Sequence, residues 1–170
     1  MAMARDTAAE GMRLYLLEGW AGRVPLEGVP AVVDGAFKRL DKRGFRPNLV
    51  GVENTLWQAP LVKTIRRDYP HLPLFEIDRR KAKNPTKRVR AGNLLYHYEQ
   101  RHVFHPTTRT PWLEEYEDEL LQFTGDDRQD GHDDMVDAAI DACDALTVGT
   151  YLAEAFSPPA YHTFSFDANM

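Results

Sequence analysis

The chain has 170 residues, of which 43% are hydrophobic and 28% are charged, and its formal net charge at pH 7 is -5. These values predict a soluble globular protein with one domain and a real core. No apolar stretch of about 18 residues is present and the N-terminus has no signal-peptide layout, so neither a membrane span nor secretion is expected. The single cysteine, Cys143, excludes a disulfide framework and agrees with a reducing cytoplasm.

The basic residues are concentrated in one segment. No acidic residue interrupts the chain from Arg79 to Tyr98, and seven of the 21 Lys and Arg residues fall there: Arg79, Arg80, Lys81, Lys83, Lys87, Arg88 and Arg90. The net negative charge alone would argue against a polyanion as partner, but an acidic helix and a concentrated basic segment in one small domain are expected of a protein that binds metal and phosphate together. The alternative interpretation is a solvated loop.

The first part of the chain predicts a β-hairpin and then a helix. Residues 2–6 and 12–20 are expected to be strands joined by a turn at 7–11. After a connection rich in Gly and Pro, apolar residues recur at helical spacing from Val32 to Leu40, and Gly44 follows the helix end.

The next part alternates strands and helices. The run from Leu49 to Glu53 predicts a buried strand with Glu53 at its carboxyl end, where open α/β sheets place ligands. A helix should begin near Pro60 and end before Tyr69, and a strand should follow at 72–77.

Three further helices are expected in the last part. The first has an inward stripe of Ala91, Leu94, Leu95 and Tyr98, and a short extended piece follows at 103–104. The second covers 111–122 and the third about 132–147, with Cys143 in its apolar stripe. The second helix has five acids that we expect to be exposed and to favour solubility: Glu114, Glu115, Glu117, Asp118 and Glu119.

The third of these helices carries Asp134, Asp137 and Asp141 on its polar side. Carboxylates one turn apart repel each other, but a divalent cation such as Mg²⁺ is commonly held by one or two carboxylates with water and substrate phosphates. The alternative is a solvated face whose acids are favoured by the helix dipole.

Glu53, Asp133, Asp134 and Asp137 together with the basic segment point to two-metal cleavage of phosphodiesters. Two cations about 3.5 to 4 Å apart need carboxylates from different elements to activate a water and to stabilise the leaving oxygen. Positive charge nearby is needed to hold the nucleic-acid backbone. The best basic candidates for phosphate contact surround a turn and a helix start: Lys83, Lys87, Arg88 and Arg90.

Four segments resemble the C-terminal nuclease domain of phage large terminase subunits: Val50-Gly-Val-Glu53-Asn-Thr, Lys87-Arg-Val-Arg90-Ala, the stretch from Trp112 to Gly125, and above all Gly131-His-Asp-Asp-Met-Val-Asp-Ala138. The resemblance covers residues 1–148 and leaves 149–170 as a C-terminal tail. It implies an α/β, RNase H-like mixed sheet flanked by helices, related to Holliday-junction resolvases. It also implies an endonuclease that cuts concatemeric double-stranded viral DNA during packaging, with two Mg²⁺ or Mn²⁺ ions.

By this resemblance, Glu53 is the acid on the fourth strand of the family, and Asp134 and Asp137 are the catalytic ligands on the helix. Asp133 is an alternative metal ligand, because adjacent acids in the motif are hard to distinguish. His132 either orients a carboxylate or water near the metal or simply precedes the helix. His97, His102 and His105 are expected at the surface, without the cysteine pattern of a zinc site.

The sequence departs from the family in two ways. The family's first, central strand with its aspartate has no convincing equivalent here: Asp6 fits the hairpin turn, and Asp34 is expected as a cap or first-turn acid of a helix. No P-loop pattern is present, so the ATPase motor of a large terminase is missing. The chain is therefore expected to be the nuclease half alone, with an incomplete N-terminal part.

The resemblance implies partners as well as a reaction. They are double-stranded DNA, the terminase ATPase domain, the small terminase subunit and the portal, in the cytoplasm of an infected bacterial host, with no membrane. Two alternatives remain open: a catalytically incomplete DNA-binding or assembly module, and a resolvase-like enzyme for branched DNA.

Overall fold

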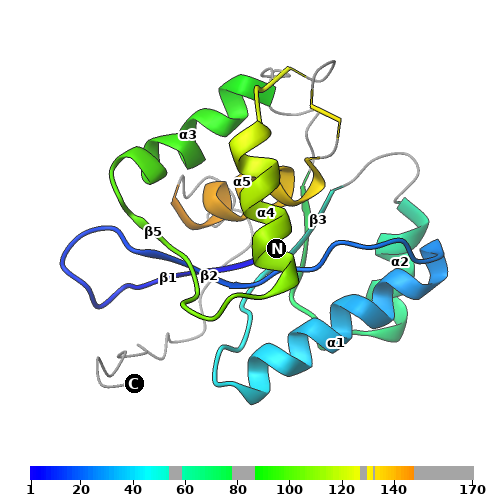
Figure 1. The fold of residues 1–170 in the computed structure, drawn as a ribbon. Helices are drawn as coiled ribbons and strands as arrows, with labels where there is room; N and C mark the ends of the chain where they lie inside the picture. Colours follow the sequence, from blue (N-terminus) through cyan, green and yellow to red (C-terminus); the bar gives the residue numbers. More distant parts are fainter. Residues whose placement is uncertain (54–58, 78–86, 127–129, 132, 148–170) are drawn as a thin grey trace. The chain divides into compact units, whose positions relative to one another are not determined.

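The computed structural model describes residues 1–53, 59–77, 87–126, 130–131 and 133–147. It is mixed α/β (Figure 1). Its chain divides into two compact units, one of Met1–Ala21 with Pro85–Met170 and one of Gly22–Asn84. Each has its own hydrophobic core. That the two units fold as one domain over residues 1–148 stays a prediction.

The first unit contains a mixed sheet. Strands β1 (Ala2–Arg5) and β2 (Leu14–Glu18) are antiparallel, which confirms the hairpin, and β2 runs parallel to β5 (Val103–Phe104). The Asp6 side chain accepts hydrogen bonds from the backbone N–H groups of Ala8 (2.9 Å) and Ala9 (3.2 Å), so it orders the hairpin turn as predicted.

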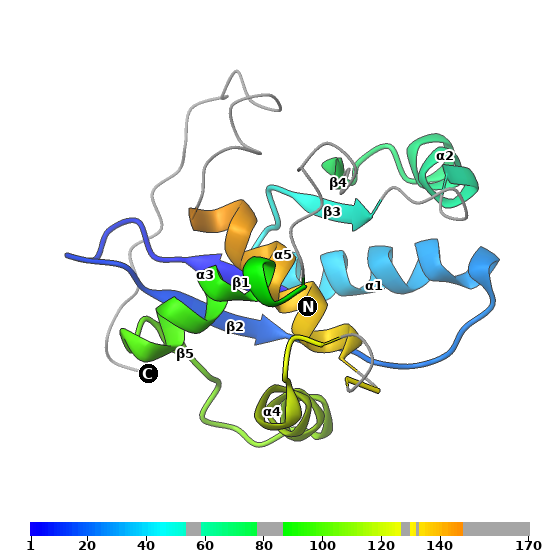
Figure 2. The same cartoon turned by 90° about the horizontal axis from the view of Figure 1, so that it is seen from above.

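The described residues of this unit also form three helices: α3 (Lys87–Glu99), α4 (Pro111–Gln122) and α5 (Asp134–Thr147). Helix α5, orange in Figure 1, packs against α3, α4 and β1, and Figure 2 shows the same elements from above. Its apolar residues meet the inward side chains of β2 in one buried core that contains Leu14, Leu16, Ala91, Leu94, Leu113, Tyr116, Met135, Val136, Ala139, Ile140 and Cys143. The prediction that Cys143 is a core residue is confirmed.

In the second unit, the part of the chain that the structure describes pairs two strands with two helices. After a 3-10 turn at Leu26–Gly28 the chain forms α1 (Val29–Lys42), β3 (Val50–Glu53), α2 (Ala59–Asp68) and β4 (Leu74–Ile77). Strands β3 and β4 are parallel. The core lies between one face of this sheet and the helices, and includes Phe37, Leu61, Ile65 and Leu72, with Val50, Val52 and Leu74 packed against it.

Two predictions for the second unit are wrong. Strand β3 is half-buried instead of buried, because the pair of strands has core on one face and Gly51 is exposed. Asp34 does not begin a helix: α1 begins at Val29, so Asp34 lies in its second turn, where it is buried and pairs with Lys38 and His71. The hydrogen bond from Lys38 is the main reason that the pKa of Asp34 lies below its ordinary value.

In the described parts of the chain, no helix has both the length and the apolar character needed to cross a membrane.

Candidate functional site

Helix α5 begins where a residue of another helix caps it. The backbone carbonyl of Asp133 accepts the first helical hydrogen bond, from the N–H of Asp137 (2.8 Å). The Glu119 carboxylate of α4 accepts bonds from the N–H groups of Met135 (2.9 Å) and Val136 (3.2 Å). Glu119 thus satisfies two of the free N–H groups of the α5 N-terminus. The expectation that Glu119 only favours solubility is therefore wrong.

The buried side of α5 determines where its acids lie. Met135, Val136, Ala139 and Ile140 are buried in the core. The polar side therefore faces outward and toward α3, and its acids differ in exposure: Asp133, Asp137 and Asp141 are partly buried, whereas Asp134 is exposed.

Two basic residues of α3 contact the acids of α5. The ammonium group of Lys87 lies against Asp133 and is 3.9 Å from a carboxylate oxygen of Asp137. The guanidinium of Arg90 donates to Asp137 at 3.4 Å and is 3.9 Å from Asp141. Three acids on and just before α5 thus lie in a row, and two basic side chains of α3 contact them. We call this group of five residues the α3–α5 charge row: Lys87, Arg90, Asp133, Asp137 and Asp141.

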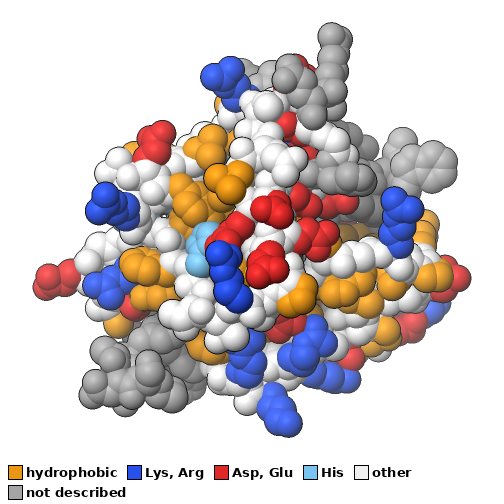
Figure 3. All heavy atoms as spheres, in the orientation of Figure 1, with side chains coloured by type: hydrophobic (Ala, Val, Ile, Leu, Met, Phe, Trp, Pro, Cys, Tyr) orange, Lys and Arg blue, Asp and Glu red, His pale blue; other side chains and the backbone are white. Residues whose placement is uncertain are grey.

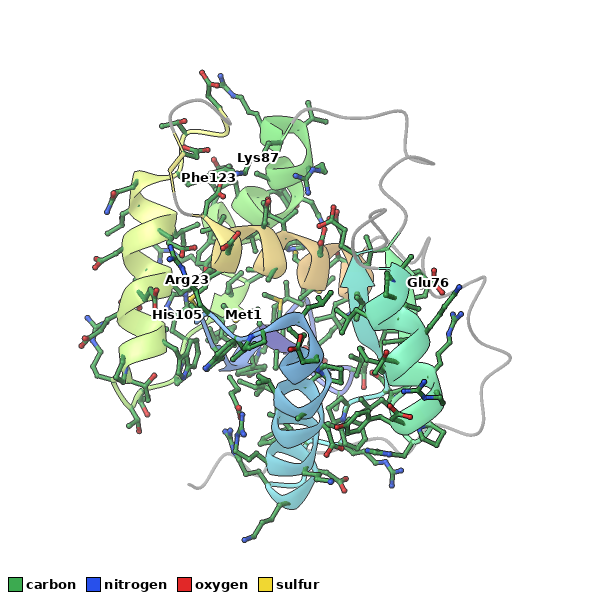
Figure 4. All side chains as sticks on the ribbon, turned by 90° about the vertical axis from the view of Figure 1, so that its right-hand side faces the viewer. Met1, Arg23, Glu76, Lys87, His105 and Phe123 are labelled. Carbon is green, nitrogen blue, oxygen red and sulfur yellow. The ribbon has the colours of Figure 1, made fainter. Side chains whose placement is uncertain are left out.

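Lys87 is the most enclosed member of this row. Its side chain is 7% exposed, and its ammonium also lies 5.7 Å from the centre of the Phe123 ring, a cation–π contact (Figure 4). A buried ammonium needs negative partners, and Asp133 and Asp137 supply them. In this arrangement the charge of Lys87 is directed at carboxylates of its own unit.

The polar contacts continue to the end of α5. The amide nitrogen of Asn93 donates to the Asp144 carboxylate (2.8 Å) and to the Thr147 hydroxyl (2.7 Å). Burial is the main cause that raises the pKa of Asp144 above its ordinary value, and the nearby charge of Asp141 adds to it. Asp144 was not among the sequence candidates, although its spacing from Asp137 and Asp141 puts it on the same face of the helix.

The loop before α5 fixes the start of α3. Gly125 has a backbone φ of +76°, and a Cβ on it would lie 2.9 Å from Cβ of Arg88, so glycine is required here for two reasons. The Asp130 carboxylate accepts hydrogen bonds from the N–H groups of Thr124 (2.8 Å) and Gly125 (2.9 Å). Gly125 therefore lies against the start of α3, and the Asp130 carboxylate helps to keep it there.

The charge row has the oxygen donors that a hard cation prefers. Asp133 and Asp137 are separated by one helical turn, and Mg²⁺ is often held by one or two protein carboxylates. Within the described residues, however, no group of three or more His, Cys, Asp or Glu side chains is arranged to hold a metal. The donor set fits one cation held by this pair, which would have to compete with Lys87.

The other predicted site residues are distributed as follows. Glu53 ends β3, and because side chains alternate along a strand it lies on the face opposite Val52, away from the core of its unit. Arg88 is exposed at the start of α3. Lys83 and His132 lie outside the described residues. The structure thus brings Asp133 and Asp137 together with Lys87 and Arg90, all within the first unit.

A second polar network joins α3 to α4. The Tyr98 hydroxyl is 2.8 Å from Nε2 of His105 and 2.9 Å from the hydroxyl of Tyr116, and Nδ1 of His105 is 2.8 Å from Glu117. Arg109 also contacts Glu117. The hydrogen bond to His105 is the main reason that the pKa of Glu117 lies below its ordinary value, whereas burial raises the pKa of Tyr116 to about 12.

These contacts correct two sequence expectations. Glu117 has a structural role beyond solubility. His97 is not at the surface: it is 5% exposed, its Nδ1 is 3.0 Å from Nδ1 of His102, and burial is the main cause that lowers its pKa. The partners of His105 come from α3 and α4, so helical spacing alone did not predict them.

Comparisons of this chain with protein-family models, with curated proteins and with solved structures find no match.

Proposed function

We propose that this chain is a metal-dependent endonuclease domain for double-stranded DNA, of the kind found in terminases, with the RNase H-like fold that the resemblance implies. The observation that carries the proposal is the α3–α5 charge row, in which Asp133 and Asp137 lie half-buried beside two basic residues. Asp133 and Asp137 would hold the ion, in place of the pair Asp134 and Asp137 that the resemblance implies, because Asp134 is exposed. That Glu53 is the ligand from the strand stays an expectation from the resemblance.

A bound Mg²⁺ or Mn²⁺ would act as a Lewis acid and lower the pKa of a water for attack on phosphorus. The chain's own residues would bind and orient the substrate. Lys87 and Arg90 neutralise Asp137 while no ion is present. A metal ion that binds Asp137 would displace these two side chains, and each could then contact a DNA phosphate. Arg88, which is exposed, would contact the backbone without reading sequence.

The proposal includes the setting implied by the resemblance. The ATPase domain of a terminase, its small subunit and the portal would direct the domain to concatemeric DNA in the cytoplasm of an infected bacterium. Cutting by the isolated chain should then be slow and unspecific. The two-ion form of the mechanism requires Glu53 in addition to the acids of α5, and Glu53→Gln tests that requirement separately.

Plasmid nicking tests the proposal. The 170-residue chain is incubated with supercoiled DNA in Mn²⁺, in Mg²⁺ and in EDTA, and Asp133→Asn, Asp134→Ala and Asp137→Asn are compared with Asp118→Asn, a matched change on an exposed acid of α4. We expect metal-dependent nicking that falls by roughly tenfold to a hundredfold in Asp133→Asn and Asp137→Asn. Full activity in both of these variants would contradict the assignment.

A second candidate function is a non-catalytic DNA-binding or assembly module. The observation that favours it is the contact of Lys87 with Asp133, because acids that are already neutralised have less need of a metal ion. Retained DNA binding in a gel-shift assay, without nicking in either metal, would support this candidate. Comparing a four-way junction with linear duplex as substrates would identify a resolvase-like preference.

A further inference from the structure

The outer face of α3 carries exposed apolar residues with charges at its two ends. Val89, Leu95 and Tyr96 are 66%, 38% and 51% exposed, and Figure 3 shows hydrophobic side chains at the surface in the region of α3. The outer face consists of Arg88, Val89, Gly92, Leu95, Tyr96 and Glu99. The exposure of Leu95 overturns the sequence prediction that it belongs to the inward stripe of the helix.

Gly92 lies in the middle of this face. A Cβ on Gly92 would meet no heavy atom within 4 Å in the described chain, so packing inside the unit gives no reason for a glycine here. Glycine inside a helix is unfavourable compared with alanine. A helix that must accept a close neighbour on its outer side does require such a residue, because a side chain from the neighbour then fits against the backbone.

The charges on this face of one α3 are complementary to the charges on the same face of a second α3. Arg88 is exposed near the start of α3, and Glu99 is exposed at its end. A second α3 can pack antiparallel to the first, with the two-fold axis level with the point between Asn93 and Leu94. Each residue before that point then faces the residue of the second copy that lies equally far after it. Arg88 then faces Glu99 of the second copy. The same symmetry brings Leu95 to Gly92 of the second copy, so a large side chain meets a residue that has none.

We propose that two copies of this chain associate through the outer face of α3. The helices pair antiparallel, with Leu95 of each copy against Gly92 of the other and an Arg88–Glu99 ion pair at each end. An Arg88 paired in this way does not contact DNA, so the DNA contact of Arg88 proposed above applies to the monomer. The contact is isologous, so every interaction occurs twice. One helix of 13 residues offers a small interface, and the dimer is therefore weak, with a dissociation constant in the micromolar range or above.

Sedimentation equilibrium of the full 170-residue chain over a concentration series tests this proposal. We expect a monomer–dimer equilibrium in the unaltered protein. Glu99→Arg replaces both ion pairs by repulsive Arg–Arg contacts and should weaken association at least tenfold, as should Arg88→Glu. The double variant Arg88→Glu, Glu99→Arg re-forms both pairs in reverse and should restore association.

Two further variants separate this contact from general effects of charge or folding. Arg46→Glu makes the same charge change as Arg88→Glu, at an exposed position outside α3, and should leave association unchanged. Gly92→Ala should raise the thermal unfolding temperature, since alanine favours the helix, and should weaken the dimer. A chain that is monomeric at every concentration, or a dimer unaffected by Glu99→Arg, would overturn the proposal.

Discussion

Lys87 is the residue on which the charge row depends. Its ammonium is buried, contacts Asp133 and Asp137, and also lies over the ring of Phe123. Removing one member of a buried ion pair costs far more than an exposed pair is worth, because the remaining charge keeps its desolvation penalty. A metal ion that binds Asp133 and Asp137 would have to displace the ammonium group of Lys87.

The variant Lys87→Met tests this double role. It should lower the free energy of unfolding by about 3 kcal/mol, since Asp133 then lacks its cation. Mn²⁺ should recover part of that loss, because the vacated carboxylates can hold the ion. Urea unfolding in Mn²⁺ and in EDTA measures both effects. The same experiment on Lys87→Met, Asp133→Asn is the control, in which Mn²⁺ should have a smaller effect; equal recovery in both would contradict a site at Asp133.

Asp144 gives a prediction about pH. Burial raises its pKa above the ordinary value of 3.8, so the folded protein keeps this proton to a higher pH than the unfolded chain does. Its contribution to stability is fully present below 3.8 and is lost as pH rises through the folded pKa. Asp144→Asn cannot ionise and can still accept the hydrogen bond from Asn93. Its unfolding free energy relative to the unaltered protein should rise from about pH 4 to pH 7, as urea unfolding would show; a constant difference would contradict the assigned shift.

At the scale of elements, the sequence predicts the ends of a helix best where residues of that helix alone determine them. Pro111 at the first position and apolar residues in steps of three and four place α4 at Pro111–Gln122, as predicted. The roles of Glu119 and His105 depend on partners from other elements, which spacing along one helix does not contain. The acidic side of α5 was predicted, but which of Asp133 and Asp134 turns toward α3 depends on how the two helices pack.

Helices α1 and α3 are both followed by a residue in the left-handed conformation, and this gives a prediction about stability. After α1, Gly44 has a φ of +85° and Phe45 N–H bonds to the carbonyl of Leu40; after α3, Arg101 has a φ of 57° and His102 N–H bonds to the carbonyl of His97. The left-handed conformation costs a residue with a side chain about 1 kcal/mol. Arg101→Gly should therefore stabilise the protein and Gly44→Ala should destabilise it, each by about 1 kcal/mol in thermal unfolding. A lower unfolding temperature for Arg101→Gly would contradict this account.

At the scale of the whole molecule, mixed α/β architecture follows from the order of strand and helix patterns, and the structure confirms it. The division into two units, each with its own core, was not predicted, because local patterns do not say which helices share a core. The α3–α5 charge row lies within the first unit.

The most direct test of the central claim is calorimetric titration of the metal-free chain with Mn²⁺, compared with Asp137→Asn and with the exposed control Asp118→Asn. We predict saturable Mn²⁺ binding in the unaltered chain and in Asp118→Asn, and binding weakened by roughly tenfold or more in Asp137→Asn. Mn²⁺ affinity that is the same in all three proteins, or no Mn²⁺ binding in any of them, would contradict a metal site on the acids of α5.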